Sequence, residues 1–224
     1  MAMSEDAAAA AESPGTPETA ATPTGGRRGR VRLKRTALMA VPAVAAGAVL
    51  MTLTAQGVLA AQFAISGMPF TITADRLDGK GFAQFGGLDS MIPDSPNAGS
   101  TGGQVLVAVS AIKSAQLTNL CQSVDLGGIN LVIHAGDGGT PVTATDLTTD
   151  SDLLSGDAEF TNIEIGGDAS TYTKAGPAGK GNPGVFGQQA DTVTLTHLKQ
   201  HNYASTAAGF KLPNLRLSFS SQGC

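Results

Sequence analysis

The residues best suited to chemistry form a short acidic stretch in the second half of the chain. Five carboxylates lie close together there, at positions Asp146, Asp150, Asp152, Asp157 and Glu159. Carboxylate oxygens are the ligands that calcium takes in exported proteins. The stretch lacks the Asp-x-Asp-x-Asp-Gly order of a calcium loop, so we interpret it as a solvated loop. Asp150, Asp152 and Asp157 are kept as calcium candidates, and no metal or other cofactor is otherwise predicted.

Three histidines could serve a hydrolase, namely His134, His197 and His201. The Gly-x-Ser-x-Gly elbow, which exposes the nucleophile of α/β-type serine hydrolases, does not occur in the sequence. A convergent triad needs only geometry, so an esterase-type hydrolase stays open as an alternative. We interpret His197 as a strand residue facing water and His134 as a strand-end residue, which favours a protein without catalytic activity.

Aromatic side chains offer a second kind of site. The chain has eight Phe, two Tyr and no Trp. Most Phe residues occupy apolar strand positions, which a hydrophobic core explains without further function. The rival hypothesis is an apolar groove for a lipid tail, since ligand sites are mostly apolar and concave. Its candidate residues are Phe70, Phe82, Phe85 and Phe160.

The first 61 residues indicate where the protein is sent and not how it folds. Residues 1–35 form a tail whose first 26 residues are rich in Ala, Pro, Thr and Gly and cannot bury a core, and it ends in a basic cluster. Residues 36–61 form an uncharged apolar helix. Positive charge before an apolar run is typical of an export signal or a single membrane anchor, and both stay open. Either one brings the chain to the membrane, at least transiently, and places residues 62–224 outside it.

The exported part is acidic. Six of the 14 basic residues lie between Arg27 and Arg35, and four of the 18 acidic residues precede them, so the remainder carries eight basic and 14 acidic side chains. Nucleic acid binding needs clustered Lys and Arg. This balance therefore excludes nucleic acid as a partner of the domain.

The two cysteines, Cys121 and Cys224, both follow the apolar segment. An even number of cysteines in an exported chain predicts a disulfide. It would close a loop of about 100 residues and tie down the last residue of the chain. Two free thiols are the alternative.

An internal repeat predicts the fold of residues 62–224. Four segments share the order apolar, small, apolar, polar, any, apolar: Ile72–Leu77, Val107–Ile112, Val142–Leu147 and Val193–Leu198. Each is followed by a second alternating segment, and the first such pair is joined by the Gly-rich stretch Asp78–Gly81. Alternation with β-branched residues is typical of strands, and Gly clusters are typical of turns.

We therefore predict a mainly β domain of about four similar hairpins, with further strands at 62–65, 129–134 and 215–220. The antiparallel sheet would be a sandwich or a curved, rolled sheet, because one face of each hairpin is apolar. The turns inside the second, third and fourth units differ in length, and the third and fourth would be long excursions.

The stretch Phe70-Thr71-Ile72-Thr73-Ala74-Asp75-Arg76-Leu77, the run Leu120-Cys121-Gln122-Ser123-Val124 and the closing Gly223-Cys224 resemble an uncharacterised family of secreted actinobacterial proteins. Some members of that family carry an automated cholesterol esterase label. The resemblance implies a cell-envelope location and implies no established activity.

The sequence as a whole favours a non-catalytic envelope protein that binds a lipid or an envelope partner through its β domain. A structural or surface-coat component is the first alternative, because unpaired strand edges recruit other chains. The esterase-type hydrolase is the second alternative.

Overall fold

The computed structural model describes residues 64–224, which form a single antiparallel sheet of nine strands. Four strands are long: β1 (Phe70–Ser90), β2 (Gln104–Thr118), β5 (Val142–Thr161) and β7 (Phe186–Thr206). The short elements are β3 (Leu120–Asp125), β4 (Asn130–Ala135), β6 (Glu164–Asp168), η1 (Ala169–Thr171), η2 (Pro177–Gly179), β8 (Gly209–Lys211) and β9 (Arg216–Ser220). The predicted mainly β class and curved antiparallel sheet are confirmed.

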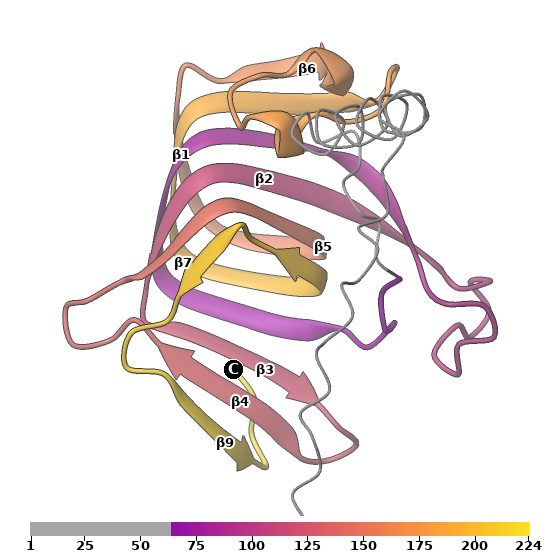
Figure 1. The fold of residues 1–224 in the computed structure, drawn as a ribbon, viewed down its shortest axis with the longest axis vertical. Helices are drawn as coiled ribbons and strands as arrows, with labels where there is room; N and C mark the ends of the chain where they lie inside the picture. Colours follow the sequence, from indigo (N-terminus) through magenta and orange to yellow (C-terminus); the bar gives the residue numbers. More distant parts are fainter. Residues whose placement is uncertain (1–63) are drawn as a thin grey trace, which may run out of the picture. The chain divides into compact units, whose positions relative to one another are not determined.

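The four long strands pair into a closed ring. β1 pairs with β2, β2 with β5, β5 with β7, and β7 again with β1. Leu77 shows the arrangement, since it faces Leu117 on one side and Leu195 on the other. Figure 1 shows the long strands bending midway, so that each one contributes to both sides of the enclosed space. The ring therefore has an inner and an outer face.

Kinks in neighbouring strands line up across the sheet. Pairing skips Gly81 of β1, which faces Lys113 of β2 and Asp191 of β7, and it skips Asp146 of β5 opposite Lys113. Gly81 and Asp146 have positive φ, of 67° and 47°. One left-handed residue interrupts the two-residue alternation of a strand and bends it locally. Because both left-handed residues lie opposite Lys113, β1 and β5 bend at the same level of the sheet.

The repeat pattern encodes such kinks in three of its four copies. Ala74 and Leu77 are both buried although they are three residues apart, an odd spacing that puts residues of a regular strand on opposite faces. The kink between them lies at Asp75, which faces His197 (φ 53°) in the equivalent position of β7. The copy in β2 is different: pairing is unbroken from Val109 to Ile112, so these two side chains point to opposite faces.

The predicted turns inside the repeat units are wrong. Asp78–Gly81 lies within β1, and the long excursions predicted in the third and fourth units belong largely to β5 and β7. Gly79 is buried between strands, and a Cβ there would lie 2.8 Å from side-chain atoms of Ile112 and Val193. These glycines serve close strand approach and a kink instead of a chain reversal.

Three short strands extend the sheet beyond β1 in the order β3, β4, β9. The strands predicted at 129–134 and 215–220 are confirmed here as β4 and β9. The strand predicted at 62–65 begins outside the described residues, and within them Ile65 forms only an isolated bridge with Met91. The predicted disulfide is also confirmed: Cys121 of β3 is bonded to Cys224, with the Cα atoms 6.0 Å apart and a sequence separation of 103. It fastens the chain end to the first strand of the extension.

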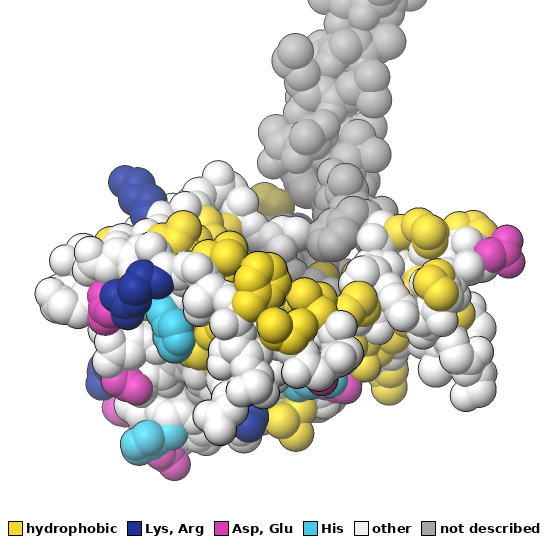
Figure 2. All heavy atoms as spheres, turned by 90° about the horizontal axis from the view of Figure 1, so that it is seen from below, with side chains coloured by type: hydrophobic (Ala, Val, Ile, Leu, Met, Phe, Trp, Pro, Cys, Tyr) yellow, Lys and Arg dark blue, Asp and Glu magenta, His cyan; other side chains and the backbone are white. Residues whose placement is uncertain are grey.

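The extension exposes hydrophobic side chains at the edge of the sheet. Leu215, Leu217 and Phe219 are each more than half exposed. Leu217 and Phe219 lie on β9, which pairs with β4 and is the last strand of the sheet among the described residues. Figure 2 shows the domain from below the view of Figure 1, with hydrophobic side chains gathered on that face.

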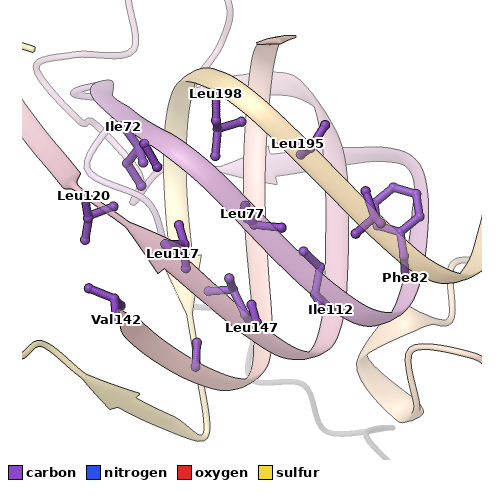
Figure 3. Close-up of a cluster of buried hydrophobic side chains, with 14 of the residues drawn as sticks. Ile72, Leu77, Phe82, Ile112, Leu117, Leu120, Val142, Leu147, Leu195 and Leu198 are labelled. Atoms are coloured by element: carbon purple, nitrogen blue, oxygen red, sulfur yellow. The ribbon is translucent and has the colours of Figure 1, made fainter. Parts of the chain in front are cut away.

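The hydrophobic core has an inner and an outer part. The inner cluster holds large side chains from all four ring strands, among them Leu77, Ile112, Leu147 and Leu195. Figure 3 shows these side chains converging from neighbouring strands. The outer cluster covers the other face of β1 and β2, where Tyr172 and small alanines of the 169–185 segment pack.

Residues 1–63 lie outside the described part of the chain, so the predicted tail and apolar helix are not addressed by the structure. Within residues 64–224, the structure has no helix of the length and apolar character needed to cross a membrane.

Candidate functional site

The inner face of the ring surrounds a cavity of about 570 Å³. All four long strands contribute to its wall, as do residues before β1 and after β7. Its large apolar lining residues are Ile65, Phe70, Ile72, Leu77, Phe82, Ile112, Leu117, Leu120, Leu147, Leu154, Leu195 and Phe210. The volume lies within the range of about 300–1,000 Å³ found for small-molecule sites.

The cavity wall is uncharged. None of its lining residues is Asp, Glu, Lys, Arg or His. The domain as a whole is acidic, so this distribution is a property of the cavity and not of the composition. An isolated charge is costly in such surroundings, because no opposite charge is present to pair with it. The cavity is therefore suited to uncharged chemical groups.

Three buried polar side chains form a small cluster in this wall. Ser110 of β2 and Thr149 of β5 are cross-strand partners, and they are 4% and 6% exposed. The side-chain amide of Gln200 on β7 lies 3.5 Å from the Thr149 hydroxyl, at the outer limit of a hydrogen bond. Ser110 accepts a hydrogen bond of 2.8 Å from Gln84. We call Ser110, Thr149 and Gln200 the polar cluster.

Gln84 itself is held in place from the opposite side. Its carbonyl oxygen accepts a 2.8 Å hydrogen bond from the amide of Gln188. This bond orients the Gln84 amide toward Ser110, so the Ser110 oxygen acts as an acceptor. The hydroxyl hydrogens of Ser110 and Thr149 are consequently left to donate to another oxygen atom.

A second hollow, of about 840 Å³, adjoins the cavity. The two share lining residues at one end, including Ile65, Ala204 and Ala207. The second hollow differs in charge, because Asp89, Asp146 and Asp150 line it together with one cation, Lys180. Its electrostatic character is acidic.

Asp89 and Asp150 are the two carboxylates with unusual environments. One oxygen of each is buried and has no hydrogen-bond partner among the described residues. Burial raises the pKa of Asp150 to about 7, and the nearby Asp89 carboxylate adds to the rise. Burial likewise raises the pKa of Asp89. Both groups therefore resist ionisation, and the pair disfavours a further negative charge at this end.

The four predicted phenylalanines fall into different places. Phe70 and Phe82 line the cavity. Phe160 is partly buried and packs on Phe82, with ring centroids 5.4 Å apart, but it is absent from the cavity wall. Phe85 lies on the outer face of the ring and lines the acidic hollow. Two of the four are thus brought together at the cavity.

The calcium candidates are not brought together. Asp150 faces the hollow, while Asp152 and Asp157 pair with His201 (2.6 Å) and His197 (2.9 Å). Among the described residues no group of three or more His, Cys, Asp or Glu side chains is placed to hold a metal ion.

The three histidines also lie away from the cavity wall. The side chain of His197 is 85% exposed, as predicted for a water-facing strand residue. His134 pairs in register with Cys121 on the extension. Ser110, the buried serine of the polar cluster, has Gln84 as its partner and not a histidine.

Sequence reasoning missed the polar cluster. Thr149 and Gln200 each lie two residues after the last apolar residue of a repeat copy, Leu147 and Leu198 respectively, and Ser110 lies two residues before Ile112. Continuing the two-residue alternation past those positions would have placed all three side chains on the inner face.

A family model matches residues 66–224, and its description is a family of unknown function, DUF6230. No curated protein and no solved structure matches the chain.

Proposed function

Because the chain belongs to the family of unknown function DUF6230, its function must be argued from its own geometry, and we propose that the domain binds an apolar small molecule, such as a single lipid chain, inside the ring. The observation that carries this proposal is the uncharged, mostly apolar cavity of about 570 Å³. At roughly 30 Å³ per non-hydrogen atom, by analogy with liquid water, it has room for about 20 such atoms. One acyl chain has this size.

Binding explains features that a core does not need. A core packs to crystal-like density and leaves few voids larger than a water molecule. Here large side chains from four strands surround open volume instead of filling it. The partial exposure of Phe210 at the wall gives a ligand an apolar contact near the entrance.

We place this activity outside the cytoplasmic membrane. The basic cluster followed by the apolar segment supports export through or anchoring in the membrane. The disulfide between Cys121 and Cys224 is consistent with an oxidising, extracellular location. A lipid-binding domain that begins soon after residue 61 would work close to the membrane that supplies its ligand.

A matched pair of substitutions tests the cavity. Ala207 lines the wall where the cavity meets the acidic hollow, whereas Ala158 is exposed on β5 and lines neither space. We expect Ala207→Trp to block uptake of the neutral fluorophore Nile red and Ala158→Trp to leave it unchanged. Equal Nile red uptake by both variants and the wild type would show that the cavity is not the binding site.

The edge strand β9 supports a second candidate function, self-association. β9 pairs on one side with β4, and Leu217 and Phe219 are exposed on it. An unpaired apolar edge recruits another strand, and β9 of a second copy is the matching partner. Sedimentation of the wild type and of Phe219→Lys tests this: a concentration-dependent dimer that the substitution abolishes is expected, and a wild-type monomer at all concentrations contradicts it.

A further inference from the structure

The polar cluster in the cavity wall specifies the ligand further. We propose that Ser110, Thr149 and Gln200 bind an uncharged oxygen atom of the ligand, such as a hydroxyl or an ester carbonyl, and that the site rejects free carboxylates. This inference rests on the proposed binding function and names the class of molecule that the same cavity takes.

The cluster is positioned to donate hydrogen bonds. Ser110 and Thr149 are opposite one another on β2 and β5, which puts their side chains about 5 Å apart on the same face. The Ser110 oxygen already accepts from Gln84, and the Thr149 oxygen is the acceptor for Gln200. A hydroxyl that accepts one bond still has its own hydrogen to donate. One ligand oxygen can therefore receive both hydrogens.

The surroundings of the cluster distinguish neutral from anionic oxygen. Each cluster residue is at least nine-tenths buried, so a bound carboxylate would lose most of its water. No Lys, Arg or His lines the cavity to compensate the charge. A neutral hydroxyl or ester loses far less hydration and gains the same hydrogen bonds.

The adjoining hollow reinforces this selectivity. A carboxylate left at the shared end, near Ala204 and Ala207, would face the side that carries Asp89 and Asp150. These two groups are short of partners, and a third acid there would add to their repulsion. Neither end of the cavity thus favours a negative charge.

The test uses protein expressed from the full-length gene and three probes with the same chain: 1-hexadecanol, methyl hexadecanoate and hexadecanoate. Displacement of Nile red at about pH 8, where the free acid is ionised, gives their relative affinities. We expect the alcohol and the ester to bind at least about tenfold more tightly than the carboxylate. Equal or tighter binding of hexadecanoate overturns the inference but leaves the cavity as a binding site.

Substitutions in the cluster separate a hydrogen-bonding role from a packing role. Thr149→Val keeps the shape and removes the hydroxyl, whereas Thr149→Ser keeps the hydroxyl. We expect hexadecanol to bind about 3- to 10-fold more weakly to Thr149→Val, the range that one hydrogen bond confers, and near normally to Thr149→Ser. Equal hexadecanol affinity in Thr149→Val and wild type contradicts the assignment. If none of the three probes displaces Nile red from the wild type, the proposed binding function itself fails.

Discussion

Ser110 and Thr149 face each other across β2 and β5 with both side chains in the cavity wall, although 38 residues of sequence separate them. The β2–β5 pairing that joins them is one side of the closed ring. Two of the three residues of the polar cluster are thus positioned by the strand register. A one-residue shift of either strand against the other would turn one of the two hydroxyls to the outer face.

The Cys121–Cys224 disulfide is expected to supply a large part of the stability. It closes a loop of 103 residues, for which the chain-entropy model gives up to about 4–5 kcal/mol. Replacing both cysteines by serine should lower the urea midpoint, with the end of the chain after β9 loosening first. Urea unfolding of the variant, compared with the reduced and oxidised wild type, measures this. Identical midpoints for all three proteins would contradict it.

Asp150 is expected to make the domain less stable as pH rises. Its pKa is about 7 in the folded protein against 3.8 in the unfolded chain. Between these values the folded state keeps a proton that the unfolded state has released, so the free energy of unfolding falls with rising pH across that window. Asp150→Asn removes the titration and should resemble wild type near pH 4 but melt at a higher temperature above about pH 7.

Thermal melts of both proteins at several pH values measure this difference. Asp152→Asn is the matched control, since Asp152 lies on the same strand and its carboxylate pairs with the partly exposed His201. A wild-type Tm that does not fall relative to Asp150→Asn between about pH 4 and 7 would argue against a buried proton at this site.

The kink at His197 is expected to tolerate glycine and reject β-branched residues. His197 has φ of 53°, a conformation that costs most L-residues about 1–2 kcal/mol and suits glycine. His197→Val should therefore destabilise the domain by about 1–2 kcal/mol, whereas His197→Gly should be near neutral. The side chain is 85% exposed, so lost packing contributes little. Denaturant unfolding of His197→Val and His197→Gly measures this difference. Equal stabilities of the two variants would exclude backbone strain at His197.

Phe70 and Phe85 are expected to separate ligand binding from packing. Both are partly buried, but Phe70 lines the cavity and Phe85 lies on the outer face of the ring. Phe70→Ala should weaken Nile red binding, and Phe85→Ala should leave the affinity unchanged while lowering stability. Fluorescence titration of both variants, with a thermal melt of each to show that it is folded, provides the comparison. The reverse order of affinities would move the binding site to the outer face.

The sequence determined the strand content and the disulfide for local reasons. Alternation such as that of Ile72 and Ala74 is a property of one segment, and it survives in the structure because one face of that segment meets the core. With two cysteines only one intrachain pairing exists, so Cys121 and Cys224 needed no knowledge of the fold.

Tertiary structure alone decided what lies between those segments. The stretch Asp78–Gly81 is locally suited to a turn or to a kink, and the continuous partners β2 and β7 on either side hold it as one extended strand. Ring closure between β1 and β7 joins residues more than 100 positions apart, such as Thr194 and Asp78. No local sequence pattern predicts that pairing. From the sequence, a polar residue in a strand is expected to face solvent. Ser110, Thr149 and Gln200 face the cavity because the strands that carry them close into a ring.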